Sequence, residues 1–172
     1  MPRNMPEPMT TALRVIVGCA LAMGITGAVA WWLAQPMLFP SLGPTVMMLA
    51  QHPGQHGTAP RTVMLAHGAA LVAGWVSLWL FGLRHAPSVL VAGITPAHVA
   101  TAAVSVAATV AATRGLRTAH PPAGATTLIV SLGLLPTLFD LVLMWAAIAV
   151  ATLVMSLYNR ALGQPAPLWR AG

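Results

Sequence analysis

Two short segments of the chain share a pattern suited to binding an anion. Residues 40–45 (PSLGPT) and 121–126 (PPAGAT) both follow P-x-x-G-x-T, 81 residues apart. A helix that begins at such a cluster leaves its first backbone N–H groups without intrahelical partners and presents partial positive charge. Glycine admits a ligand close to the backbone, and proline holds the entering chain extended. The two segments therefore predict an anion site that needs no lysine.

Hydroxyl and imidazole groups near these segments could add hydrogen bonds. His120 directly precedes Pro121 and could donate to an anion or hold a proton, because an unperturbed imidazole has a pKa of about 6.5. His67 falls in an apolar stretch, where a polar group is costly without a partner. Arg61 could attract anions at a helix entrance. The predicted binding residues are Ser41, Leu42, Gly43, Thr45, Arg61, His67, His120, Ala123, Gly124, Ala125, Thr126 and Thr127.

Other interpretations of these and nearby residues stay open. Each Pro/Gly cluster could be only a turn, and each histidine only a packing residue. Asp140 could be functional or could pair with an arginine. Polar residues at four-residue spacing could line a pathway, although such residues more often bond the carbonyls of their own helix: Thr101, Ser105, Thr109 and Thr113.

The composition places these residues in a membrane protein. Of 172 residues, 58% are hydrophobic and 6% are charged, and the only acidic residues are Glu7 and Asp140. A soluble domain has roughly 25% charged residues. The net charge of +6 does not indicate nucleic-acid binding, because the arginines lie at the edges of apolar stretches. The sequence has no P-loop, dinucleotide turn or carboxylate pair, so we do not expect an enzyme.

The lengths of the apolar stretches predict the architecture. Four are long enough to cross a hydrocarbon core of about 30 Å as helices, and two are too short. We expect an all-α membrane protein with four long transmembrane helices and two half-helices, forming one domain over residues 1–172. The long stretches are 15–34, 62–83, 96–113 and 136–157, the short ones are 37–50 and 123–135, and the two repeats cover about 12–84 and 90–160.

The arginines predict the topology. If both short segments turn back within the bilayer, the arginines divide five to three between the two sides. If both cross, they divide seven to one, with Arg84 alone opposite. The positive-inside bias favours six crossings, both termini cytoplasmic, in a bacterial inner (plasma) membrane. Three crossings per repeat would make the repeats inverted, as in many transporters.

Residues 120–125 (HPPAGA) and 39–45 (FPSLGPT), with Pro60-Arg61 followed by His67, resemble the HPP family of integral membrane proteins. The likeness spans about residues 10–160. It implies a fold usually described with four transmembrane helices. Some members are linked to nitrite transport across chloroplast or cyanobacterial membranes, so the resemblance implies that this chain moves nitrite or a similar small anion.

We therefore expect transport or channelling of a small monovalent anion, nitrite first, at the starts of the two half-helices. The first alternative is a membrane sensor or assembly subunit whose motifs only pack helices. The second is a metal-binding protein using His52, His56, His67 and His120. Pro53-Gly54 makes it less favourable, because this pair breaks the helix that would align His52 with His56. We expect no cofactor and no metal. The expected partners are the anion, the lipid bilayer and, because the chain is small, a second copy in a homodimer or other homo-oligomer.

Overall fold

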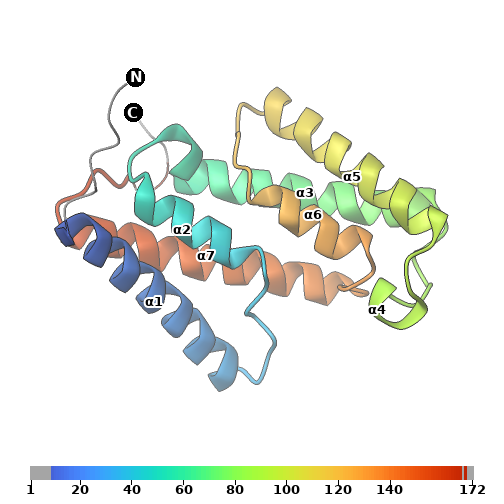
Figure 1. The fold of residues 1–172 in the computed structure, drawn as a ribbon, viewed down its shortest axis with the longest axis horizontal. Coiled ribbons are helices and arrows are strands. Elements are labelled where there is room, and N and C mark those ends of the chain that lie inside the picture. Colours follow the sequence, from blue (N-terminus) through green and yellow to red (C-terminus); the bar gives the residue numbers. More distant parts are fainter. Residues whose placement is uncertain (1–8, 168, 170–172) are drawn as a thin grey trace.

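The computed structural model describes residues 9–167 and Trp169, and in this part of the chain all regular structure is helical (Figure 1). The prediction of an all-α membrane fold is confirmed. The elements are α1 (Met9–Trp32), α2 (Leu42–Gln51), the 3₁₀ turn η1 (His56–Thr58), α3 (Pro60–Leu80), α4 (Val89–Ala92), α5 (Pro96–Gly115), α6 (Ala123–Ser131) and α7 (Leu138–Ala161).

The four predicted spans correspond to α1, α3, α5 and α7, which are long and apolar enough to cross a membrane. Their outward sides carry large apolar residues such as Ile16, Val72 and Leu153, each more than half exposed. A continuous apolar exterior of this kind suits a lipid environment. α1 starts earlier than predicted, at Met9, because Arg14 finds partners within the protein and does not end the helix.

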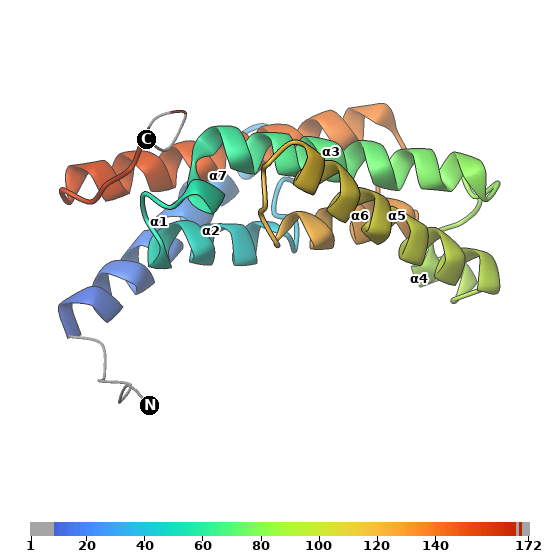
Figure 2. The same ribbon diagram turned by 90° about the horizontal axis from the view of Figure 1, so that it is seen from above.

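The long helices run in two directions. α1 and α3 run one way along the long axis of the molecule, and α5 and α7 run the other way (Figures 1 and 2). The half-helices α2 and α6 begin near the middle of the molecule and run toward opposite ends (Figure 1). The start of α1 and the end of α7 therefore lie toward the same end.

The helix contacts have a matching pattern in the two halves. α1 packs against α2 and α7, and α5 packs against α6 and α3. α2 packs against α7, α6 packs against α3, and α3 contacts α7. Each of these contacts has a counterpart when α1, α2 and α3 are exchanged with α5, α6 and α7. Each half-helix is thus held by the last long helix of the other half.

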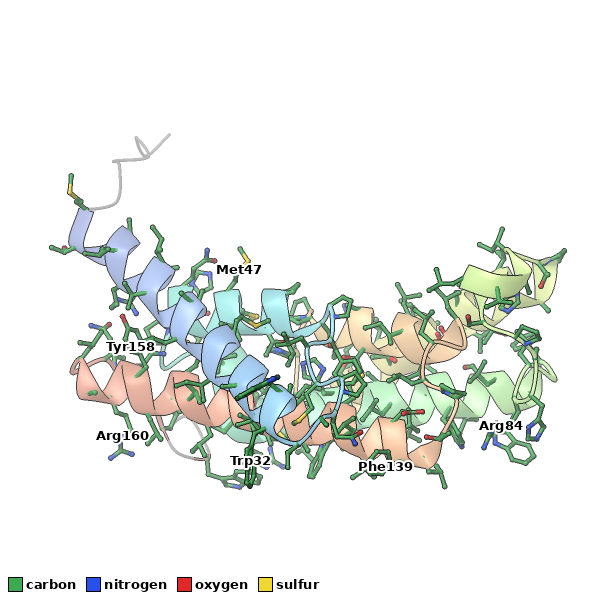
Figure 3. The ribbon with its side chains drawn as sticks, turned by 90° about the horizontal axis from the view of Figure 1, so that it is seen from below. Trp32, Met47, Arg84, Phe139, Tyr158 and Arg160 are labelled. Atoms are coloured by element: carbon green, nitrogen blue, oxygen red, sulfur yellow. The ribbon has the colours of Figure 1, made fainter. Side chains whose placement is uncertain are left out.

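Polar groups at the helix ends fix this packing. The Arg14 guanidinium donates to the carbonyl of Ala50 (3.0 Å) and to Oδ1 of Asn159 (3.3 Å). Asn159 donates to the Leu49 carbonyl (3.0 Å), and the Tyr158 hydroxyl, which lies between α1 and α7 (Figure 3), donates to the Arg14 carbonyl (3.0 Å). A positive group at the negative end of α2 complements the helix dipole. These bonds tie α2 to α1 and α7.

Asp140 has a local structural role. Its carboxylate accepts from the Thr137 backbone N–H (2.9 Å), and Thr137 Oγ1 accepts from the Asp140 N–H (3.1 Å). This reciprocal capping box starts α7. The structure thus gives Asp140 a role that neither sequence interpretation included.

The hydroxyl groups along α5 bond to their own helix. Thr101 donates to the Ala97 carbonyl, Thr109 to that of Ser105 and Thr113 to that of Thr109, each at 2.8 Å. Ser105 does the same to Ala102 at 2.9 Å. The interpretation that these hydroxyls bond the carbonyls of their own helix is confirmed.

Candidate functional site

The starts of α2 and α6 meet at one buried imidazole. Thr45 and Thr126 are each the fourth residue of their half-helix, and each is the threonine of P-x-x-G-x-T. Thr45 Oγ1 lies 3.0 Å from His67 Nε2, and Thr126 Oγ1 lies 2.7 Å from His67 Nδ1. All three side chains are fully buried. His67, in the first half of α3, therefore joins the two half-helices through its two ring nitrogens.

A second imidazole extends this arrangement. His120 Nδ1 lies 2.8 Å from the Gly57 carbonyl oxygen, and its Nε2 lies 3.5 Å from Thr45 Oγ1. The rings of His67 and His120 are 5.1 Å apart between centroids and are inclined at 61°. We call Thr45, His67, His120 and Thr126 the histidine network. It joins α2, α3, α6 and the segment before α6 in one buried polar cluster.

Ser41 adds a hydroxyl at the start of α2. Its side chain is fully buried, and its Oγ has no hydrogen-bond partner in the structure. Burial of an unpartnered hydroxyl is unfavourable by about 1–3 kcal/mol. This hydroxyl is thus available to a ligand at the N-terminus of α2.

Four backbone N–H groups at the two helix starts have partners, contrary to the prediction that these groups lack them. In α6, Ala123, Gly124 and Ala125 donate to the carbonyls of the three preceding residues, His120 to Pro122, at 2.9–3.1 Å. In α2, the Leu42 N–H donates to the Phe39 carbonyl at 3.0 Å. Tight turns before each helix place these carbonyls within reach. An anion at either start would share these N–H groups with the turns, while the helix dipoles keep their direction.

The outward sides of the two helix starts are open. A Cβ atom added at Gly43 or Gly124 would meet no heavy atom within 4 Å. Pro40, Pro44 and Pro121 are exposed. Seen from above, α3 and α7 lie together on one side of the half-helices α2 and α6 (Figure 2). Space therefore adjoins both glycines of the repeated pattern.

Several predicted site residues lie outside the histidine network. Leu42 is buried in the apolar core, and Ala123 packs with Ala66 and Ala70. Thr127 Oγ1 lies 3.5 Å from the Ser105 carbonyl, on the side of α5. Arg61 is half-buried at the start of α3, where its backbone N–H donates to the Trp169 carbonyl at 2.9 Å. Nothing in the sequence indicated that the Gly57 carbonyl would accept from His120.

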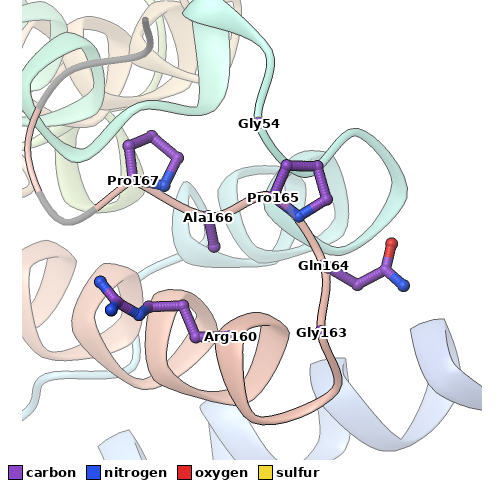
Figure 4. A pocket seen from close by; sticks show the side chains of 7 residues that line it. All are labelled: Gly54, Arg160, Gly163, Gln164, Pro165, Ala166 and Pro167. Carbon is purple, nitrogen blue, oxygen red and sulfur yellow. The ribbon is translucent and has the colours of Figure 1, made fainter.

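A surface pocket lies apart from this network, at the end of α7 (Figure 4). It forms where the segment after α7 passes close to Gly54, since a Cβ atom at Gly54 would lie 2.7 Å from the Pro165 carbonyl oxygen. None of the predicted binding residues lines it. The lining residues are Gly54, Arg160, Gly163, Gln164, Pro165, Ala166 and Pro167.

Metal binding was the second alternative from the sequence. Within residues 9–167 and Trp169, no group of three or more histidine, cysteine, aspartate or glutamate side chains could hold a metal ion. His67 and His120 instead bond to hydroxyl and carbonyl oxygens.

Comparison with known families decides the membership of the chain. The model described as "HPP, transmembrane region" matches residues 4–167. The chain belongs to the HPP transmembrane family. In this HPP-family protein, His120-Pro121-Pro122 lies next to the start of α6, with His120 and Pro122 buried and Pro121 exposed. Together with its four apolar helices, membership makes the chain an integral membrane protein. No curated protein and no solved structure matches the chain significantly.

Proposed function

We propose that this HPP-family protein transports or channels a small monovalent anion, nitrite first, across the membrane at the starts of α2 and α6. The observation that carries the proposal is the pair of contacts from Thr45 and Thr126 to the two nitrogens of His67. These contacts bring the positive ends of two helix dipoles to one buried polar cluster. Membership of a transmembrane family is consistent with transport.

The charge distribution supports an anion as the substrate. Within the described part of the chain, Asp140 is the only acidic residue. It lies at the start of α7 and uses its carboxylate as a helix cap. The histidine network contains only imidazole and hydroxyl groups, and Ser41 offers a further hydroxyl. Helix N-termini and neutral donors stabilise a buried anion without a lysine or arginine.

We further propose that the two halves are inverted repeats. The opposite directions of the long helices, the exchangeable helix contacts and the equal positions of Thr45 and Thr126 support this relationship. Both termini would then face the cytoplasm of a bacterium. Arg160 and Arg84, which lie at opposite ends of the molecule (Figure 3), fit the predicted division of the arginines. Rocking of one repeat against the other would expose the central site to each side in turn.

In the arrangement described, the His67 ring fills the space between Thr45 and Thr126. Passage of an anion therefore requires that at least one of these bonds opens. An anion that accepts a hydrogen bond from the freed Thr126 hydroxyl would replace the imidazole as its partner. Opening and closing of the histidine network is thus the proposed gate.

We also propose a homodimer. Irregular backbone at membrane depth is stable only where protein or water covers it, and Pro40 and Pro121, in the segments leading into α2 and α6, are exposed. A cysteine at Met47, which is 51% exposed on α2, in a Cys19→Ser background should form disulfide-linked dimers in membranes. A cysteine at Val72, 63% exposed on α3, is the control. Monomers alone from both variants would contradict a dimer through this side.

The function is tested by flux into liposomes. Purified protein in proteoliposomes should pass nitrite above the rate of protein-free liposomes, and Gly124→Val should abolish this flux by filling the space at the start of α6. Gly24→Val is the matched control, because Gly24 is exposed in α1 and has no neighbour within 4 Å of its Cβ position. No flux of nitrite, nitrate, formate or chloride at any pH would favour the sensor or assembly subunit.

A further inference from the structure

We propose that His67 and His120 together form a binding site for one exchangeable proton, and that each transported anion moves with this proton. The second part rests on the proposed anion transport. The first part concerns only the hydrogen bonds of the histidine network and holds whatever the substrate is.

The outer end of the network fixes the first proton. The Gly57 carbonyl oxygen can only accept a hydrogen bond, and His120 Nδ1 lies 2.8 Å from it. His120 therefore has its proton on Nδ1 and donates it to Gly57. In a neutral His120 the other nitrogen, Nε2, then has a lone pair and no hydrogen.

The hydroxyl of Thr45 fixes the second proton. Thr45 Oγ1 donates to the Ser41 carbonyl at 2.8 Å, so its single hydrogen is already used. Toward His67 it can only accept, and His67 Nε2 must donate across the 3.0 Å contact. His67 Nδ1 then accepts from the Thr126 hydroxyl at 2.7 Å.

One contact in the network remains without a hydrogen. His120 Nε2 and Thr45 Oγ1 face each other with lone pairs only, and at 3.5 Å this contact is the longest of the four. An added proton on His120 Nε2 would complete it, because Thr45 Oγ1 can accept a second hydrogen bond. An O–H bond of hydronium breaks as its proton adds to the Nε2 lone pair, which forms an N–H bond and leaves water. Release breaks the same bond, with no change in oxidation state.

The surroundings limit His67 and His120 to one added proton. The two rings are 5.1 Å apart and buried, so two positive charges would repel each other strongly. α2 and α6 contain no titratable side chain. The Cys19 thiol of α1 packs against the apolar core. The other titratable or charged groups of the packed elements lie toward the element ends or bond elsewhere: Arg14 of α1, His56 of η1, Arg61 of α3, His98 and Arg114 of α5, and Asp140, Tyr158 and Arg160 of α7.

The added proton places one positive charge between the two half-helix starts. One monovalent anion would neutralise it, so the loaded site is electrically neutral. Neutral loading lowers the cost of moving an ion through a low-dielectric region. Transport should therefore move no net charge and should accelerate as the pH falls on the side from which the anion enters.

Nitrogen-15 NMR of histidine-labelled full-length protein in lipid nanodiscs tests the proton site without any transport. His67→Gln and His120→Gln assign the two rings. At alkaline pH we expect Nε2–H with a bare Nδ1 for His67, and the reverse for His120. On acidification the pair should bind a single proton. The opposite tautomers, or binding of an added proton by both rings at once, would overturn the proposed site.

Flux measurements test the coupling. Proteoliposomes containing a pH dye should show one proton entering per nitrate or nitrite, with no dependence on membrane potential, and nitrate excludes diffusion of a weak acid. His120→Gln should remove the pH dependence, while His85→Gln, at an exposed loop position, should keep it. Anion flux without protons would overturn coupling but leave the proposed function intact. A one-proton pair without any anion flux would overturn the proposed function but leave the proton site intact.

Discussion

Thr45 and Thr126 hydrogen bond to opposite nitrogens of the same imidazole, that of His67. The two threonines are 81 residues apart in the sequence and occupy the same position in two half-helices that run in opposite directions. α7, the counterpart of α3 in the second half, contains no histidine, so the two threonines share the one imidazole of His67. The centre of the protein is therefore asymmetric in chemistry although its helices correspond.

Thr126→Val should destabilise the protein by about 1–3 kcal/mol, because His67 Nδ1 would remain buried without a donor. Thr101→Val is the control, since Thr101 is equally buried but donates only to a carbonyl of its own helix. Thermal unfolding in detergent should show a clearly lower midpoint for Thr126→Val. Equal midpoints for the two variants would contradict a structural contribution from this bond.

Gly74→Ala should disrupt the packing of α3 on α6. The new Cβ atom would lie 2.8 Å from Val130 Cβ and 2.9 Å from the Thr127 carbonyl oxygen, and such overpacking typically costs about 1–3 kcal/mol. Gly24→Ala, in α1, meets no atom and should be neutral or slightly stabilising because alanine favours helix. The two variants are compared by thermal unfolding. An unchanged unfolding midpoint of Gly74→Ala would contradict the close contact between α3 and α6.

Arg14→Ala should loosen the end of α2. It removes the donor to the Ala50 carbonyl and leaves Asn159 Oδ1 without this partner, so we expect a loss of about 1–3 kcal/mol. Arg114→Ala, at an exposed position near the end of α5, should have little effect. Faster hydrogen exchange in residues 46–51 of Arg14→Ala, but not of Arg114→Ala, would show the loosening directly. Unchanged exchange in both would contradict it.

Thr137→Ala should weaken the start of α7 by about 1 kcal/mol, because it removes the side-chain half of the capping box with Asp140. Thr137→Ser keeps the hydroxyl and should retain most of the stability. Anion flux should be unchanged in both variants, since this cap lies outside the histidine network. A loss of flux in Thr137→Ser would indicate a functional role for this helix start.

The sequence by itself determined the membrane class, the long helices and the half-helices. Scarcity of charge and the lengths of apolar stretches set which segments can cross a bilayer, and these properties are local. Proline and glycine in the repeated pattern likewise fixed where α2 and α6 begin, because their effect on the backbone does not depend on distant residues. The equal register of Thr45 and Thr126 was also visible in the sequence.

Only the tertiary structure decided what these elements meet. That His67 bonds to both threonines depends on the packing of α3 against α6 and on a contact between residues 59 apart in sequence. The turns before the half-helices pair several backbone N–H groups that the sequence predicted to be free, and Asp140 binds its own helix start in place of an arginine. Each outcome depends on the direction of particular bonds in three dimensions. A one-dimensional pattern states which groups can bond but not which partners the fold brings within reach.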